Sequence, residues 1–312
     1  MIRSFMPLDV VDLLVAGKTL SNKARTREGL GGKDGRFGDL ADMVFGWFNP
    51  RQRSGAWVLT EGLSLKGLAS VTTRCSSRSW DVNRLMVGDH DDWPCLKLLE
   101  HVSSAAGQLQ IGRIFLCLAA GSSLLKPAQD TGFLPYSSDH LYCLENDGAP
   151  APAKGARSGN GSSPGLQPRR KKADDEYRLF ELYLRCAPPP VRRAEGTTYG
   201  EWQAHRRRSP GQEWVFEKDG GIVGWAATSA GRDSGLLDIP AVTREDMESV
   251  VDYGLSALAG CRRTFCLVPD ADAALQRLLE GRGFTRRATY SALMKELLVR
   301  VVEPYAMPVV PA

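Results

Sequence analysis

The chain carries one segment twice, and this repeat is the feature that most constrains its fold. RTFCLVPDADAALQRLLEGRGF begins at Arg263, and a related segment, RIFLCLAAGSSLLKPAQDTGF, begins 150 positions earlier at Arg113. Each copy predicts a buried strand followed by a short helix that ends at Gly-Phe. Gly132 and Gly283 fit a helix C-cap, which needs positive φ. A unit of this length is a domain rather than a solenoid repeat, so we expect two copies of one fold.

A stretch of low complexity separates the two copies. Residues 146–174 are rich in Gly, Pro, Ala and Ser, and they end in the basic run Arg169–Lys172. Such a composition offers little apolar surface to bury and favours a flexible linker. For a chain of 312 residues, 43% of them hydrophobic, we therefore expect domains at 1–145 and 175–312.

The segments before the repeated phrase also match one another. WVLTEGLSLKGLASVTTRCSSRSWDVNRLMV and WVFEKDGGIVGWAATSAGRDSGLLDIPAV each predict three short strands joined by turns, which is an antiparallel meander. A helical segment follows each meander, and in the first copy Leu96, Leu99, Val102 and Ala106 can share one face. We expect an α+β fold in each half, with a mixed, mostly antiparallel sheet flanked by helices.

Composition restricts the classes of function. Seven scattered cysteines without a C-x-x-C pair indicate neither a disulfide framework nor a zinc site, and they favour a reducing cytoplasm. No apolar run is long enough to span a bilayer, and the four histidines show no ligand spacing, so we expect no membrane anchor and no metal. A net charge of +4 suits an anionic partner without requiring one.

The order of the expected elements carries a resemblance. A meander, a helix, a strand, a helix closed by Gly-Phe and a final strand occur in both halves. This order resembles the GNAT superfamily of acyl-CoA-dependent N-acyltransferases, and LLEHVSSAAGQLQIGRIFLCLAAGSSLLKPAQDTGF looks like the central and fourth-helix motifs of that family. The resemblance covers both halves, so the chain is similar to a tandem GNAT protein.

The resemblance implies a chemistry and a place for it. Acetyl-CoA or another acyl-CoA would enter between the fourth and fifth strands, which splay apart, and a primary amine would accept the acyl group. A carboxylate or water would take the amine proton, and a backbone N–H of the fourth strand would stabilise the oxyanion. The resemblance places acyl-CoA contacts in both halves, at Met86, Val87, Ala241, Val242, Thr243 and Arg244.

The loops before the central helices depart from the family's phosphate-binding pattern, Arg/Gln-x-x-Gly-x-Gly/Ala. The first half has HDDWPC, in which His90 stands at the basic position while Trp93 and Cys95 replace small residues. The second half has REDMES, which keeps Arg244 but places Met247 and Ser249 in the sequence positions of small residues.

Carboxylates crowd both helix starts. The residues concerned are Asp89, Asp91, Asp92, Glu245, Asp246 and Glu248. Thr243 and Asp246 are spaced like a capping box. We expect these carboxylates to occupy the positive ends of the helices and to disfavour a bound phosphate.

The expected catalytic groups are carboxylates of the fourth strands and tyrosines near the fourth helices. Asp81 and Asp238 are the candidate bases, and both allow a solvent-facing structural role as well. In the family, a tyrosine on the fourth helix often protonates the departing thiolate. At this position the chain has Ala128 in the first half and Leu279 in the second. Tyr136 and Tyr290 are the candidate substitutes, with half-buried packing as the alternative.

Three functions remain open at this level. The first is an N-acyltransferase active in one half, with the second half favoured because it keeps Arg244. The second is a GNAT-like protein that has lost catalysis and binds a ligand or a protein partner. The third is a nucleic-acid-associated protein that uses the basic run Arg169–Lys172, although a basic run in a linker is usually only solvated.

Overall fold

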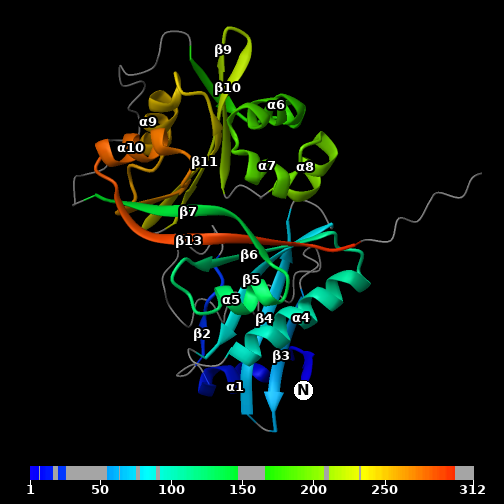
Figure 1. Cartoon of the computed structure of the whole chain (residues 1–312). Coiled ribbons are helices and arrows are strands. Elements are labelled where there is room, and N and C mark those ends of the chain that lie inside the picture. Colours follow the sequence, from blue (N-terminus) through cyan, green and yellow to red (C-terminus); the bar gives the residue numbers. More distant parts are fainter. Residues whose placement is uncertain are drawn as a thin grey trace, which may run out of the picture.

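The computed structural model describes residues 1–6, 8–16, 20–25, 55–62, 64–74, 78–88, 92–146, 166–206, 211–231 and 233–298. Asp89, His90 and Asp91 lie outside these ranges. The described helices and strands form two halves that lie on either side of two long strands (Figure 1).

The first half contains seven strands and three helices within the described residues. They are β1 (Ile2–Ser4), α1 (Asp9–Ala16), β2 (Ser21–Asn22), β3 (Gly55–Glu61), β4 (Ser64–Thr73), β5 (Ser79–Val87), α4 (Asp92–Gln108), β6 (Arg113–Ala119), α5 (Leu125–Asp130) and β7 (Leu134–Glu145).

The second half repeats this order with additional helices. Its elements are β8 (Gln167–Arg170), a 3-10 helix (Ala173–Asp175), α6 (Glu176–Cys186), α7 (Pro189–Glu195), α8 (Tyr199–His205), β9 (Gln212–Lys218), β10 (Gly221–Ala230), β11 (Ser234–Val242), α9 (Met247–Ala257), β12 (Arg263–Pro269), α10 (Ala273–Gly281) and β13 (Thr285–Glu296).

The predicted meanders form as expected. Strands β3, β4 and β5 pair antiparallel in order, and so do β9, β10 and β11. The glycines before Phe133 and Phe284 have φ values of +90° and +87°, as the predicted helix ends require. The buried residues of α4 are Pro94, Cys95, Leu98, Leu99, Val102 and Ala106, whereas Leu96 is only half-buried.

Helices cover both faces of the sheet. In the first half α4 packs on the meander to form the largest core, and α1 lies over β3 and β4, where its Leu13 is buried together with Phe5. In the second half α9 and α10 cover one face while α6 and α8 cover the other. Within the described ranges no helix is both long and apolar enough to cross a membrane.

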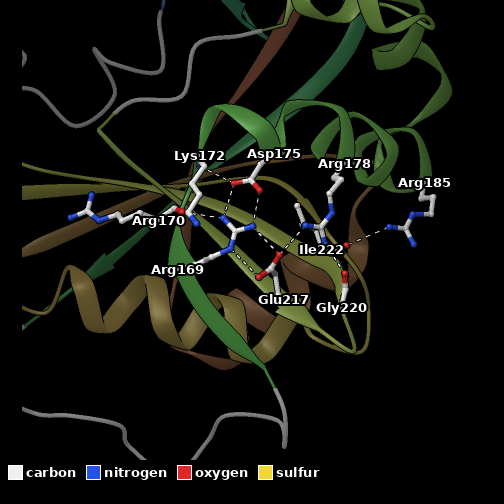
Figure 2. Close-up of polar contacts among 9 residues, drawn as sticks. All are labelled: Arg169, Arg170, Lys172, Asp175, Arg178, Arg185, Glu217, Gly220 and Ile222. Atoms are coloured by element: carbon white, nitrogen blue, oxygen red, sulfur yellow. Dashed lines mark hydrogen bonds and ion pairs between the residues drawn. The ribbon is translucent and has the colours of Figure 1, made fainter.

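The second copy of the fold begins before the expected boundary at residue 175. In the first half Arg3 forms two hydrogen bonds to Asp9, at 2.7 and 2.5 Å, and the backbone N–H of Met6 donates to the same carboxylate at 2.7 Å. The second half repeats this clasp: Arg169 donates twice to Asp175, at 2.7 Å each, and the N–H of Lys172 donates to it at 2.7 Å (Figure 2).

The final segment of the predicted linker is therefore structured. Residues 167–170 form β8, which pairs antiparallel with β9 as the edge of the second half's sheet. In each half the first strand carries the arginine of this clasp, and the carboxylate lies six residues later. The repeat unit therefore starts at β1 in the first half and at β8 in the second.

The final strands of the two halves are exchanged. Strand β13 pairs antiparallel with β6 of the first half, and β7 pairs antiparallel with β12 of the second half. The two exchanged strands also pair with one another, so they run side by side between the halves (Figure 1). One continuous sheet results, in the order β1-β3-β4-β5-β6-β13-β7-β12-β11-β10-β9-β8.

Because of the exchange, the sheet of each half is completed by the final strand of the other. Each last strand follows a helix that ends in Gly-Phe, and each fits the same gap beside a fifth strand. Because the two halves have similar sequence patterns, the sequence indicates that a final strand pairs beside each fifth strand but not which of the two copies does so. The same ambiguity underlies the domain swapping of identical elements.

Candidate functional site

A cleft opens in the second half where two parallel strands diverge. Strands β11 and β12 pair from Ser234–Arg263 to Leu237–Cys266, and β11 then continues to Val242 without β12 as its partner. A cleft of about 460 Å³ lies at this fork. Its lining comes from β11, the end of β12, the helices α6 to α9, Trp225 of β10, and β7. Because β7 belongs to the first half, the cleft is built from both copies of the fold.

The corresponding fork of the first half is filled by its own chain. Strands β5 and β6 pair only from Ser79–Arg113 to Asp81–Phe115. Beyond that point residues 21–25 lie between them: the N–H of Lys23 donates to the carbonyl of Leu85 at 2.9 Å, and the N–H of Arg25 donates to that of Cys117 at 3.0 Å.

Residues 21–25 are held in this fork by a buried side chain and by hydrogen bonds to its backbone. Ala24 is fully buried and bridges Leu118, and the side-chain oxygen of Asn22 accepts the N–H of Leu85 at 3.0 Å. Met86 and Val87, two expected acyl-CoA contacts, are paired with Asn22 and Ser21. The expected acyl-CoA contacts of the first half are therefore paired within the protein.

Asp238 lies at the open fork and is 4% exposed, so its carboxyl points inward rather than to bulk solvent. The start of β11 and the start of β5 are equivalent, because Ser234 pairs with Arg263 as Ser79 pairs with Arg113. The position that matches Asp238 in the first half is thus Asn83, whose side-chain oxygen accepts a hydrogen bond from Ser70 at 2.8 Å. An amide cannot act as a carboxylate base.

Asp81, the other candidate base, occupies a different position. It pairs with the buried guanidinium of Arg74 at 2.9 Å and is not among the residues that line the cleft. By the strand register, Asp81 of β5 corresponds to Leu236 of β11 and not to Asp238.

The two candidate tyrosines have different environments. Tyr136 lines the cleft, although it belongs to the first half and reaches the second only through the exchange of β7. Tyr290 of β13 does not line the cleft; it packs with Leu141 and Leu267 and lies opposite Asp139 in the register of β13 and β7. Ala128 and Leu279 are fully buried in the two main cores.

Two further buried carboxylates line the cleft and were missed at the sequence level. Asp139 is 2% exposed and Glu195 is 8% exposed. Ser137 donates to Asp139 at 2.6 Å. Asp139 sits on the exchanged strand and Glu195 at the end of α7, so only the exchange and the helix packing bring them to Asp238. No local sequence pattern indicated that Asp139 and Glu195 would line the same cleft as Asp238.

The expected acyl-CoA contacts of the second half all line the cleft. Ala241 and Val242 end β11, and Thr243 and Arg244 form the following loop. Arg244 is exposed, and the structure shows no hydrogen bond or ion pair for it within the described residues. Cys186 of α6 also lines the cleft, where its thiol donates to the carbonyl of Val242 at 3.2 Å. Burial raises the pKa of this thiol.

The start of α9 differs from the expectation of a capping carboxylate. Asp246 makes no side-chain bond to the first turn of α9. It instead accepts a hydrogen bond from the hydroxyl of Thr243 at 3.0 Å and pairs with Lys218 at 3.1 Å. Lys218 thus offsets the charge of Asp246, one of the carboxylates that were expected to disfavour a bound phosphate. Glu245 still lines the cleft near Arg244.

The basic run Arg169–Lys172 is largely engaged in internal contacts. Arg169 binds Asp175 and Glu217, and Arg178 adds a second cation to Glu217 at 3.0 Å (Figure 2). Lys171 pairs with Glu176 and Glu213, and Arg170 lies 4.3 Å above the ring of Trp214. The run therefore fastens β8 to β9 and α6. Among the described residues no group of His, Cys, Asp or Glu is arranged to hold a metal ion.

Comparisons with known proteins agree with this architecture. No protein-family model and no curated protein sequence matches the chain. Among solved structures, a tandem GNAT protein from the clavulanic acid biosynthesis pathway matches with a TM-score of 0.55 and 15% identity, over 95% of this chain and 98% of that one.

Two further structures match over similar lengths. A GCN5-related N-acetyltransferase from Sphaerobacter thermophilus gives a TM-score of 0.52 at 16% identity, over 95% of both chains. A Pyrococcus horikoshii protein classed as an acetyltransferase gives 0.54 at 11% identity, over 96% of this chain and 90% of that one. Identities this low establish the fold and not the reaction. The chain has the fold of the tandem GNAT proteins.

Proposed function

We propose that the cleft of the second half binds an acyl-CoA and that the protein transfers the acyl group to a primary amine. The observation that carries this proposal is the contrast between the two forks. The fork of β11 and β12 holds an open cleft with a buried carboxylate, whereas residues 21–25 fill the fork of β5 and β6. The cytoplasm, with its supply of acyl-CoA, is the proposed location.

The residues of the cleft suit this substrate. A volume of about 460 Å³ lies in the range of small-molecule sites. Arg244 and Arg185 are two of the arginines that line the cleft, and they would take the place of the glycine-rich phosphate loop that the sequence lacks. When bound, acyl-CoA supplies a thioester that is activated toward amines.

The chain's own groups would then move protons. Asp238 takes the proton that the amine nitrogen loses as it forms the amide bond. Tyr136 gives a proton to the sulfur that leaves as the carbon–sulfur bond breaks. Asp139 and Glu195 line the same cleft and favour an acceptor that carries a positive charge apart from its reacting amine, which attacks in the neutral form.

Calorimetric titration with acetyl-CoA tests the binding step. We expect a single site per chain, because the fork of the first half is filled. Arg244→Gln weakens binding about fivefold, the effect of roughly 1 kcal/mol. Arg277→Gln serves as the matched control, since Arg277 is an exposed arginine outside the cleft. Absence of heat from acetyl-CoA and from longer acyl-CoAs contradicts the proposal.

Release of the free CoA thiol tests the chemical step. The acceptor probes are 1,4-diaminobutane, glycinamide and lysine. Asp238→Asn lowers amine-dependent release about 100-fold while acetyl-CoA still binds. Release that is unchanged by this substitution rules out Asp238 as the base. Binding of acetyl-CoA without release for any amine supports instead a catalytically degenerate binding protein.

A further inference from the structure

Arg74 is a buried arginine of the first half that directly follows β4. Its side chain is 2% exposed, and its Nε and one terminal nitrogen bind the carboxylate of Asp81 at 2.9 Å each. Burial of a guanidinium is unfavourable unless its N–H groups are bonded, so this geometry is strongly constrained.

The other terminal nitrogen of Arg74 reaches the second half. It donates to the carbonyl of His205 at 2.8 Å and lies 3.6 Å from the carboxylate of Glu195. These residues end α8 and α7, where carbonyls lack intrahelical partners and carry partial negative charge. Burial lowers the pKa of His205 to about 4, with Arg113 and Arg74 adding to the effect, so its ring is neutral.

Two neighbours of Arg74 make similar contacts without its connection to the cleft. The hydroxyl of Ser79 donates to the carbonyl of Ala204 at 2.9 Å, and Arg113 donates to that of Ala194 at 3.0 Å. The first half thus caps the C-terminal ends of both helices.

Arg74 contacts the lining of the cleft by two routes. It pairs with Glu195 directly. Its guanidinium carbon also lies 3.3 Å from the centre of the Phe115 ring, and that ring meets Tyr136 edge to face at 6.0 Å. Glu195 and Tyr136 both line the cleft, and they approach it from different halves of the chain.

We propose that Arg74 is a positioning residue for the cleft of the second half, holding Glu195 directly and Tyr136 through Phe115. The first half, whose own fork is filled, serves as a fixed wall of the second half's site. This inference rests on the proposed function for its catalytic meaning, but its geometry can be tested without turnover.

Cys186 provides a readout of that geometry. It lines the cleft at the end of α6, and Arg192 of α7 donates to the carbonyl of Leu184 at 2.9 Å, which ties the two helices together. A shift of α7 therefore changes access to the Cys186 thiol. The rate of its alkylation by N-ethylmaleimide can be followed on the full chain by peptide mass mapping.

The variants are Arg74→Met and Arg74→Lys, with Arg3→Met as a matched control. Arg3 also pairs with a buried carboxylate of the first half, Asp9, but neither residue lines the cleft. Arg74→Met speeds alkylation of Cys186 severalfold and lowers amine-dependent CoA release about tenfold or more, with acetyl-CoA affinity little changed. Arg74→Lys falls between, because a lysine lacks the planar fork that joins three partners.

The control lowers the melting temperature but changes neither alkylation nor CoA release. Alkylation in Arg74→Met at the wild-type rate overturns the inference. So does an equal increase in Arg3→Met at the same loss of melting temperature. If Arg74→Met does not fold, Arg74→Lys and Glu195→Gln carry the comparison. A wild-type protein that binds no acetyl-CoA refutes the proposed function alone, since the alkylation result stands by itself.

Discussion

Glu217 holds the centre of an ion cluster that joins β8, β9 and α6. It accepts hydrogen bonds from Arg169 at 2.8 and 2.9 Å and from Arg178 at 3.0 Å (Figure 2). The bond from Arg169, followed by that from Arg178, lowers the pKa of Glu217 to about 2. The sequence left open a contact of the basic run Arg169–Lys172 with nucleic acid. In the structure, Arg169 of this run instead holds the edge strand β8 against β9 and α6.

Glu217→Gln tests this cluster by its pH dependence. A carboxylate with a lowered folded-state pKa stabilises the protein fully above its unfolded pKa, near 4.5, and loses that contribution as the pH falls toward 2. We expect the substitution to reduce the free energy of unfolding by about 1 kcal/mol at pH 7. The difference from the wild type shrinks between pH 4.5 and 2.

Urea unfolding at a series of pH values measures the effect. Glu181→Gln, an exposed glutamate on α6, is the control and should be neutral throughout. A wild-type advantage that persists at pH 2 contradicts the role given to Glu217.

At the scale of elements, the turn between α7 and α8 joins two helices that line the cleft. Gly196 has a φ of +125°, and a Cβ added there would lie 2.3 Å from the backbone nitrogen of Trp202. Helix α8 then begins with a capping box in which Thr198 accepts the N–H of Glu201 at 3.3 Å. The turn therefore requires glycine both for its backbone angle and for close contact.

Gly196→Ala should lower the free energy of unfolding by about 2–3 kcal/mol, because both the strained angle and the clash must be relieved by movement of α8. Gly200→Ala is the control within α8, where an added Cβ meets nothing within 4 Å. It should be neutral or stabilise by up to about 1 kcal/mol. Thermal unfolding compares the two, and equal melting temperatures would refute the account of the turn.

Much of this arrangement could be predicted from the sequence because it depends on local patterns. The meanders follow from alternating strands and turn residues, and Gly132 and Gly283 marked the helix ends correctly. The site was harder to predict. Of the two candidate bases, the structure places Asp238 in the cleft and Asp81 in an ion pair with Arg74, because the position of a side chain depends on strand register and not on its residue type alone.

Other features depend on contacts that no local pattern encodes. Residues 21–25 show no strand alternation, and only the fork of β5 and β6 gives them a partner. The capping arrangement expected at Thr243 fails because Lys218, which is distant in sequence, attracts Asp246. Asp139 lines the same cleft as Asp238 only because of the exchange of two similar strands, between which the sequence cannot choose.

At the scale of the whole molecule, the exchanged strands predict how the halves behave apart. Residues 1–146 and 166–312, produced as separate chains, should each fail to give a cooperative unfolding transition. In the first half β6 lacks β13, and in the second β12 lacks β7. Produced together, they should associate and regain the transition.

Affinity capture through a tag on one fragment, with thermal unfolding of the recovered complex, checks this expectation. The whole chain serves as the reference. Two fragments that fold separately as monomers would show that each half can close on its own final strand, and the exchange would then be dispensable.

The exchange also has a consequence for how the protein is made. Within the described residues both partners of β7, β12 and β13, come from the second half. A ribosome that has finished the first half has therefore made a strand with no neighbour to bind. Domains synthesised first usually fold first, but here the gap beside β6 stays open until β13, the last described strand, has emerged. The final residues of the sheet thus complete the half of the molecule that was synthesised earliest.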